Sequence, residues 1–225
     1  INSYMATTKP TFKTIIESSV KRGTMPTDVL ESRTWYRQKA MQMTGLREVS
    51  TERFERIGRL NKRMKPTLKS RLMLGRLFMF QYEPKLRETL DYYDKFPCVF
   101  PIEAHSDGFL GVNMHYLPYV WRARLMDNLY DLATNQKMDN TTKLRVMTNG
   151  YNILNRSSKY RYFKPCVRKY LFEHALSRYM EVPADEWEIA IFLPLERFTS
   201  ESGGRSTRKK IWMDTRTKYA RQKGR

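Results

Sequence analysis

The chain has 225 residues, of which 40% are hydrophobic and 13% aromatic, so it contains the apolar material for a folded core that disordered proteins lack. No apolar run approaches the roughly 18–20 residues that cross a bilayer, and residues 1–12 lack the apolar segment of a signal peptide. We therefore expect neither a membrane protein nor a secreted one. The net charge of +19, from 42 Lys and Arg against 23 Asp and Glu, gives a pI of about 10.0.

The positive charge gathers at the two ends of the chain. Residues 1–70 hold 15 basic and 6 acidic side chains, residues 71–200 hold 18 and 15, and residues 201–225 hold 9 and 2. Phosphate binding grows with the number of cations presented, so two basic arms around a nearly balanced centre indicate a polyanionic partner, most often nucleic acid. A solvated, solubilising surface is the alternative reading of the same charge.

The first 70 residues are predicted to form helices separated by turns. A first helix begins near Phe12 and is broken before Pro26, and a second begins at Thr27-Asp28 and ends at Gly45. A third helix is expected over residues 50–64, with a narrow apolar stripe and a broad basic side. This pattern predicts a helical basic N-terminal arm.

From residue 71 the pattern changes to short apolar runs with period two. Residues 74–82, 96–102 and 108–116 are predicted as strands, with a hairpin turn at Asp107-Gly108. We expect these strands to form a bent antiparallel sheet or a small β-barrel, with bends or bulges at Gly108 and Gly111.

Helices and one more strand are predicted to follow. Pro118 opens a helix whose apolar stripe includes Trp121 and Leu125, with Arg122 and Arg124 off that stripe. Residues 165–180 are predicted as another helix, and the β-forming run 188–195 as a strand that completes the sheet. After Phe198 the composition changes to a Ser- and Gly-rich hinge and a basic tail.

These elements predict an α+β fold: a bent antiparallel sheet or small β-barrel with packed helices, a helical basic N-terminal arm and an extended basic C-terminal tail. The expected organisation is a helical basic region over 1–70, a central α+β domain over 71–198 and a flexible basic tail over 199–225.

No catalytic or metal-binding motif stands out. Cys98 and Cys166 lack CxxC spacing and a nearby His pair, and the three histidines lie far apart, so His115 is expected to be packed or hydrogen-bonded. The carboxylates Asp91, Asp94, Glu103 and Asp107 cluster in the sequence, and this makes a metal-dependent nuclease a weaker alternative. We predict a protein that is not an enzyme and has no cofactor and no metal.

Two basic segments are predicted to bind nucleic acid. Each mixes cations with aromatic side chains, which suits phosphate and stacking contacts, although the tyrosines of the first segment could equally anchor on the core. The predicted nucleic-acid-binding residues are Arg156, Lys159, Arg161, Lys164, Arg205, Arg208, Lys209, Lys210, Arg216, Lys218, Arg221, Lys223 and Arg225. Trp212 and Tyr219 are expected to dock into a partner groove rather than to stack on bases, and the Trp35-Tyr36 pair is expected to belong to the core.

Several motifs resemble a known group of proteins. These are Gly75 before an aromatic strand, a Tyr82-x-Pro-Lys85 step, a Leu90-x-Tyr-Tyr-Asp-x-Phe-Pro97 run and a Gly108-Phe-x-Gly-x-Asn-x-His-Tyr-Leu-Pro118 run, followed by the motifs that begin at Lys164, Glu188 and Trp212. Together they cover about half of the chain, and they resemble virion proteins of T-even-type contractile-tailed bacteriophages, most of all the DNA end protector family. The opening Ile1 suggests that the sequence lacks its natural start.

The resemblance implies a minor virion protein of a tailed phage that contacts packaged DNA or its end through basic arms. It further implies double-stranded DNA and other phage virion proteins as partners, a symmetric oligomeric assembly, no membrane, and a location in the virion and, during assembly, in the host cytoplasm. The alternative is a purely structural neck, tail or baseplate protein whose arms bind neighbouring subunits.

Overall fold

The computed structural model describes residues 10–24, 32–45, 52–54, 56, 74–129, 150, 152–158, 164–200, 209–214 and 217. The named elements are α1 (Phe12–Lys21), α2 (Arg33–Thr44), β1 (Leu77–Met79), β2 (Tyr92–Asp94), β3 (Cys98–Ala104), β4 (Gly108–Asn113), the 3₁₀ turn η1 (Met114–Tyr116), α4 (Tyr119–Asn128), η2 (Lys164–Cys166), β5 (Val167–Leu171), η3 (Phe172–His174), β6 (Met180–Val182), η4 (Ala184–Glu186), α7 (Trp187–Ala190) and β7 (Phe198–Ser200). Residues 152–158 and 209–214 are also helical.

The fold combines helices with an open antiparallel sheet, as the α+β prediction requires. The sheet has the strand order β5-β4-β3-β1-β6, and β2 pairs with β7 in a separate two-stranded sheet. Of the two predicted arrangements, the antiparallel sheet is confirmed and the small barrel is wrong, because the edge strands β5 and β6 do not pair with each other. The edge strand β6 has only three residues before the chain turns into η4, and that is too short to close a barrel.

The predicted hairpin joins β3 and β4, but its irregularity lies in β3. Pro101 faces Gly111 and Glu103 faces Leu110, so the register shifts across the intervening residue. Gly111 and Gly108 serve close packing, because a Cβ atom on Gly108 would lie 2.0 Å from the carbonyl oxygen of Tyr170 in β5. The glycines therefore allow neighbouring strands to approach where the sequence analysis expected bends.

The helix predicted over residues 165–180 is wrong. The segment forms η2, then β5, then η3, and β5 pairs along its whole length with β4, from Val167↔Val112 to Leu171↔Gly108. Val and Tyr are good strand formers, and the long-range pairing with β4 prevails over a local pattern that also fits helical spacing.

The strand predicted over residues 188–195 is also wrong. Its first part is the short helix α7, and Trp187 through Leu193 are all buried. A run that is buried on every side has no period, so its pattern does not separate a strand from a helix. Pro183 and the acidic Asp185 and Glu186 instead start a helical turn, and β6 completes the sheet beside β1.

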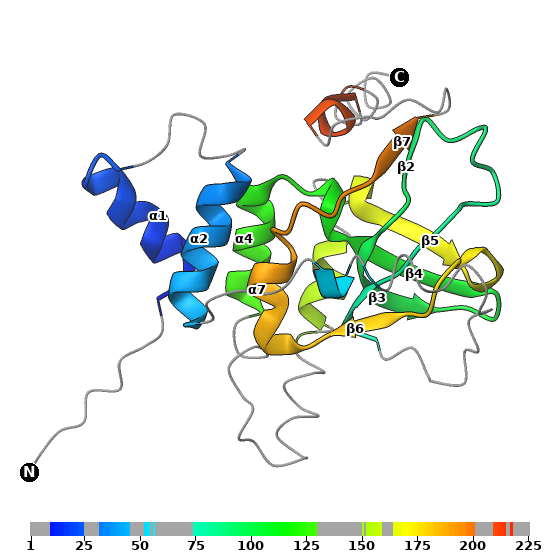
Figure 1. Cartoon of the computed structure of the whole chain (residues 1–225), viewed down its shortest axis with the longest axis horizontal. Helices are drawn as coiled ribbons and strands as arrows, with labels where there is room; N and C mark the ends of the chain where they lie inside the picture. Colours follow the sequence, from blue (N-terminus) through cyan, green and yellow to red (C-terminus); the bar gives the residue numbers. More distant parts are fainter. Residues whose placement is uncertain are drawn as a thin grey trace, which may run out of the picture.

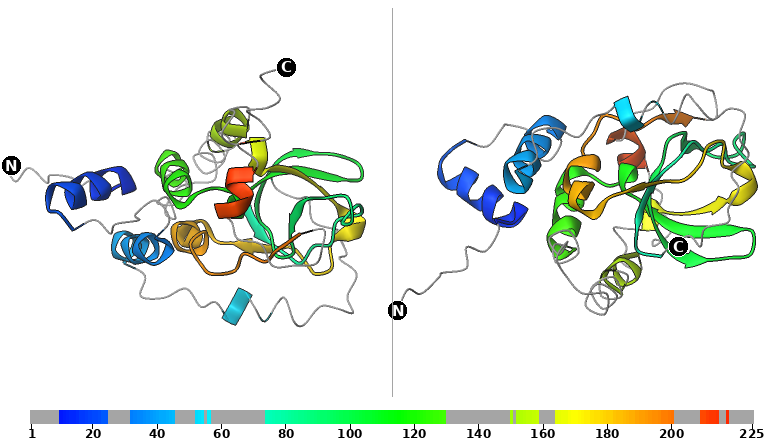
Figure 2. Two further views of the ribbon diagram at one scale, coloured as in Figure 1. Left: turned by 90° about the horizontal axis from the view of Figure 1, so that it is seen from above. Right: turned by 60° about the horizontal axis from the view of Figure 1, so that its bottom comes forward.

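The helices α1, α2, α4 and α7 gather at one end of the molecule and the sheet lies at the other (Figures 1 and 2). The main core lies between them, and it includes Leu77 and Met79 of the sheet together with Tyr36 and Phe192. Residues that alternate with these along β1 reach the opposite face of the sheet, where Phe80 packs in a smaller aromatic core (Phe78, Phe80, Tyr82, Val99, Phe109, Tyr170 and Ala175). Both faces of the sheet are therefore covered.

The first two N-terminal helices are present, and they pack onto this body. Thr11 caps α1, and Asp127 of α4 accepts hydrogen bonds from the backbone N–H groups of Phe12 (2.7 Å) and Lys13 (3.0 Å). Helix α2 ends at Gly45, whose φ of +69° favours glycine. The start predicted at Thr27-Asp28 is wrong, because α2 begins at Arg33 and is capped by the Ser32 hydroxyl, which accepts from the Trp35 N–H. The third predicted helix is described only at 52–54 and 56, which are helical.

The described part of the C-terminal tail is helical over 209–214, not extended as predicted. Ile211 is buried in the main core and Trp212 packs partly against it, and these two anchors draw the segment onto the body. The boundaries predicted at residues 70 and 198 stay predictions. In the described residues no helix is long and apolar enough to span a membrane.

Candidate nucleic-acid interface

Four of the predicted nucleic-acid-binding residues lie in the described part of the chain, and all four are exposed. They are Arg156, Lys164, Lys209 and Lys210. The other nine lie outside the described residues: Lys159, Arg161, Arg205, Arg208, Arg216, Lys218, Arg221, Lys223 and Arg225.

Each exposed cation lies beside a residue that is fixed in the protein interior. Arg156 lies on the helix over 152–158, which is held by the fully buried Leu154. Lys164 begins η2, whose Cys166 is also fully buried, and Lys209 lies two residues before the buried Ile211. Because the buried neighbour already fixes the backbone at each cation, less backbone entropy is lost when the cation binds a phosphate.

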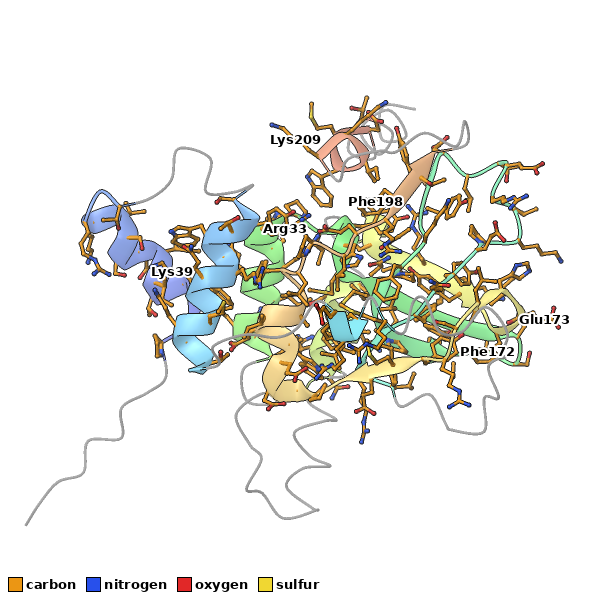
Figure 3. The ribbon with its side chains drawn as sticks, in the orientation of Figure 1. Arg33, Lys39, Phe172, Glu173, Phe198 and Lys209 are labelled. Carbon is orange, nitrogen blue, oxygen red and sulfur yellow. The ribbon has the colours of Figure 1, made fainter. Side chains whose placement is uncertain are left out.

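The helix over 209–214 is fixed beside β2 and β7. The Tyr92 hydroxyl donates a short hydrogen bond to the Asp214 carboxylate, and this bond together with burial raises the pKa of Tyr92. Figure 3 shows Lys209 on the outer side of this helix, above Phe198 of β7. Trp212 packs partly against the core of this chain itself, and its predicted docking into a partner groove stays a prediction. Tyr219 lies outside the described residues.

A polar network fills the interior beneath these elements. Burial of Asp94 disfavours its charged form, but the neighbouring His115 and hydrogen bonds outweigh burial, so the pKa of Asp94 is lowered. His115 Nδ1 lies 2.7 Å from the Asp94 carboxylate, and the backbone N–H groups of Phe96 (3.0 Å) and Arg197 (3.1 Å) donate to the same side chain. His115 is therefore packed and hydrogen-bonded, as predicted.

Arg122, which is predicted to lie off the apolar stripe of α4, is fully buried, so that prediction is wrong. Its guanidinium donates to the carbonyl oxygens of Leu117 (2.9 Å), His115 (2.9 Å) and Ile191, and to Glu196 (2.7 Å). Arg33 of α2 pairs with the other oxygen of Glu196. Burial opposes ionisation of Glu196, yet Arg122, His115 and Arg33 together lower its pKa. The apolar and aromatic neighbours of Arg122 in the sequence, Trp121 and Ala123, are the signal that could have indicated its burial.

The carboxylates considered for a metal site are used separately. Asp94 binds His115, Asp107 pairs with Lys169 (2.8 Å), and Glu103 lies 3.5 Å from His105. Across the described residues no group of three or more His, Cys, Asp and Glu side chains could hold a metal ion. Cys98 and Cys166 are free and buried, and burial raises the pKa of both thiols.

The family model described as "Phage T4 terminal DNA protecting protein" matches residues 25–215. This range contains every element of the fold except α1, and it confirms the resemblance drawn from the sequence motifs. No curated protein and no solved structure matches the chain.

Proposed function

Since the chain belongs to the phage T4 terminal DNA protecting protein family, we propose that it is a minor virion protein of a tailed bacteriophage that binds the end of the packaged double-stranded DNA and shields it. The family match over most of the chain carries this proposal. The exposed cations Arg156, Lys164, Lys209 and Lys210 and the net charge of +19 support it.

The mechanism is electrostatic and steric. Lysine and arginine side chains neutralise phosphates near the terminus and release counterions, which supplies affinity without chemistry on the DNA. An exonuclease that begins at a terminus must first reach the last base pairs. A folded body held over them blocks that access, so protection needs occupancy of the end and no catalytic residue.

The same proposal places the chain among other virion proteins and in a symmetric assembly, since a DNA end in a particle lies where its components meet. The basic segments of the chain would bind the DNA, and other surfaces of the protein would contact neighbouring subunits. In a purely structural protein the cations would bind acidic protein surfaces instead. A measurement of DNA binding therefore distinguishes the two functions.

The test is protection of linear DNA from a processive double-strand exonuclease. We expect end digestion to stop at saturating protein, binding to fall steeply as salt rises, and linear competitor DNA to reverse protection far better than closed circular DNA. Equal competition by circular DNA, or digestion that continues at saturation, would overturn end protection. Loss of all binding at physiological salt would favour the structural protein, and cleavage that requires magnesium would favour the nuclease.

A further inference from the structure

The described charge is divided unequally between the two ends of the molecule. Residues 10–24, 32–45, 119–129 and 187–190, which contain α1, α2, α4 and α7, hold eight basic and three acidic side chains. Residues 74–118, 164–186 and 191–200, which contain the sheets, hold nine basic and eleven acidic side chains. The helical end therefore has a cation excess that the sheet end lacks.

Two of these eight cations form ion pairs with a carboxylate inside the protein. Arg33 and Arg122 share Glu196, and Asp127 is occupied by the first backbone N–H groups of α1. Figure 3 shows Arg33 at the end of α2 next to α4, and Lys39 on the side of α2 nearer α1. Arg33 and Lys39 of the same helix thus face different surroundings.

Four other cations of this end form a set that we name the helical face: Lys21, Arg22, Lys39 and Arg124. Lys21, Arg22 and Arg124 are exposed and Lys39 is partly exposed. Among the described residues none of the four makes an ion pair, and the one exposed acidic residue in these segments is Glu17, one turn before Lys21 on α1. An incoming phosphate therefore does not have to displace a described carboxylate that is already paired with one of these four cations.

Three members of the helical face are held in place by neutral contacts. The Lys39 ammonium lies 5.8 Å from the centre of the Trp35 ring, and the Arg124 guanidinium lies 4.9 Å from that of Trp121. Arg22 donates to the Ser18 hydroxyl at 3.1 Å and to the Ser18 carbonyl oxygen at 3.2 Å. These contacts restrict the side chains without neutralising them, which lowers the entropy lost on binding an anion.

We propose that the helical face is the surface of the folded body that binds the phosphates of the DNA end. This inference rests on the proposed function and adds the place on the fold where the duplex lies. The helical end holds the duplex, and the strands of the sheet end, where acidic side chains outnumber basic ones, contribute less to binding.

The experiment compares two full-length variants that lose the same charge. One is Lys21→Gln/Arg22→Gln/Lys39→Gln/Arg124→Gln. The control, Lys85→Gln/Lys95→Gln/Arg178→Gln/Arg197→Gln, removes two lysines and two arginines that are exposed at the sheet end. Binding to blunt linear DNA is measured over a salt series, and protection from exonuclease is measured with the same DNA.

We expect the helical-face variant to bind roughly 10- to 100-fold more weakly, with a salt slope lower by about 2 to 4, since each lost phosphate contact lowers the slope by about 1. The control should lose less than about 3-fold. Equal losses in the two variants, or an unchanged helical-face variant, would overturn the inference. If the helical-face variant binds DNA as the wild type does, and the wild type protects DNA ends, then the proposed function stands. The helical face would in that case bind an acidic surface of a neighbouring protein.

Failure of the wild-type protein to bind or protect ends would instead count against the proposed function itself. Thermal unfolding of each variant checks the fold. If the fourfold helical-face variant does not fold, Lys21→Gln/Arg22→Gln and Lys39→Gln/Arg124→Gln are measured separately. Each double variant should lower the salt slope of DNA binding by about 1 to 2. If the slope stays at the wild-type value in both double variants, the inference is overturned.

Discussion

Arg122 and Arg124 are two residues apart on α4 and carry the same charge, yet they belong to different regions of the molecule. Arg122 lies in the buried polar network and gives all its hydrogen bonds to carbonyl oxygens and Glu196. Arg124 is exposed and rests on Trp121. In the first region charge is satisfied within the fold, and in the second it remains available to a partner. The net charge of the chain therefore overstates what a polyanion can meet.

The largest difference between the two regions is expected when the two arginines are replaced one at a time. Arg122→Met should lower the free energy of unfolding by about 3–5 kcal/mol, because it deprives the buried Glu196 and three carbonyl oxygens of their donor. Arg124→Met should change it by less than about 0.5 kcal/mol. Denaturant unfolding followed by circular dichroism measures both, and similar losses would remove the distinction between the regions.

A second prediction concerns acid. The pKa values of Asp94 and Glu196 are lower in the folded state than in the unfolded chain, so their stabilisation is complete above pH of about 4 to 4.5 and is lost as pH falls through the folded values. Asp94→Asn should lower stability at pH 7 by about 2 kcal/mol and flatten the acid dependence. Unfolding measured from pH 7 to pH 2 checks this, and an unaltered acid dependence in the variant would contradict it.

A smaller loss of stability is expected at the helix over residues 209–214, which is partly packed on the core and also presents exposed cations. Tyr92→Phe removes the hydrogen bond to Asp214 and should cost about 1 kcal/mol. We expect amide hydrogen exchange over residues 209–214 to rise about 5-fold while exchange in β3 and β4 stays the same. Equal acceleration in the sheet would show that the bond stabilises the whole fold.

The smallest expected change in stability comes from the exposed tail cations. Lys209→Gln/Lys210→Gln should alter the free energy of unfolding by less than about 0.5 kcal/mol. Its affinity for linear DNA should fall several-fold, because two phosphate contacts are lost. Lys85→Gln/Lys95→Gln is the matched control, and an equal loss of affinity in that variant would show that overall charge alone is responsible.

Much of the fold follows from local sequence. The two N-terminal helices, the β3–β4 hairpin and the helix after Pro118 are set by caps, turn residues and periodicity that act over a few positions. Residues 165–180 and 188–195 were interpreted wrongly because their structure depends on partners far away in the sequence. The strand β5 exists because β4 is beside it, and α7 is surrounded by core on all sides.

The site was predictable only in part, for a related reason. The sequence indicates which residues are cationic, and four of those predicted to bind nucleic acid are exposed in the described chain. Whether a given arginine faces water or a buried carboxylate depends on packing, as Arg122 and Arg33 show with Glu196. The helical face was missed because its members are spread over three helices and form no run in the sequence.

The bond between Arg33 and Glu196 spans 163 positions of the chain. During synthesis, α2 therefore leaves the ribosome long before the carboxylate that it needs, and its apolar side, which includes the buried Tyr36, has no finished core to pack against. Contacts between such distant positions form slowly. A polypeptide that ends before residue 187 would keep α4 as a partner for α1 and α2, but it would lack α7, Phe192 and Glu196, so one side of α2 would stay open to proteolysis or aggregation.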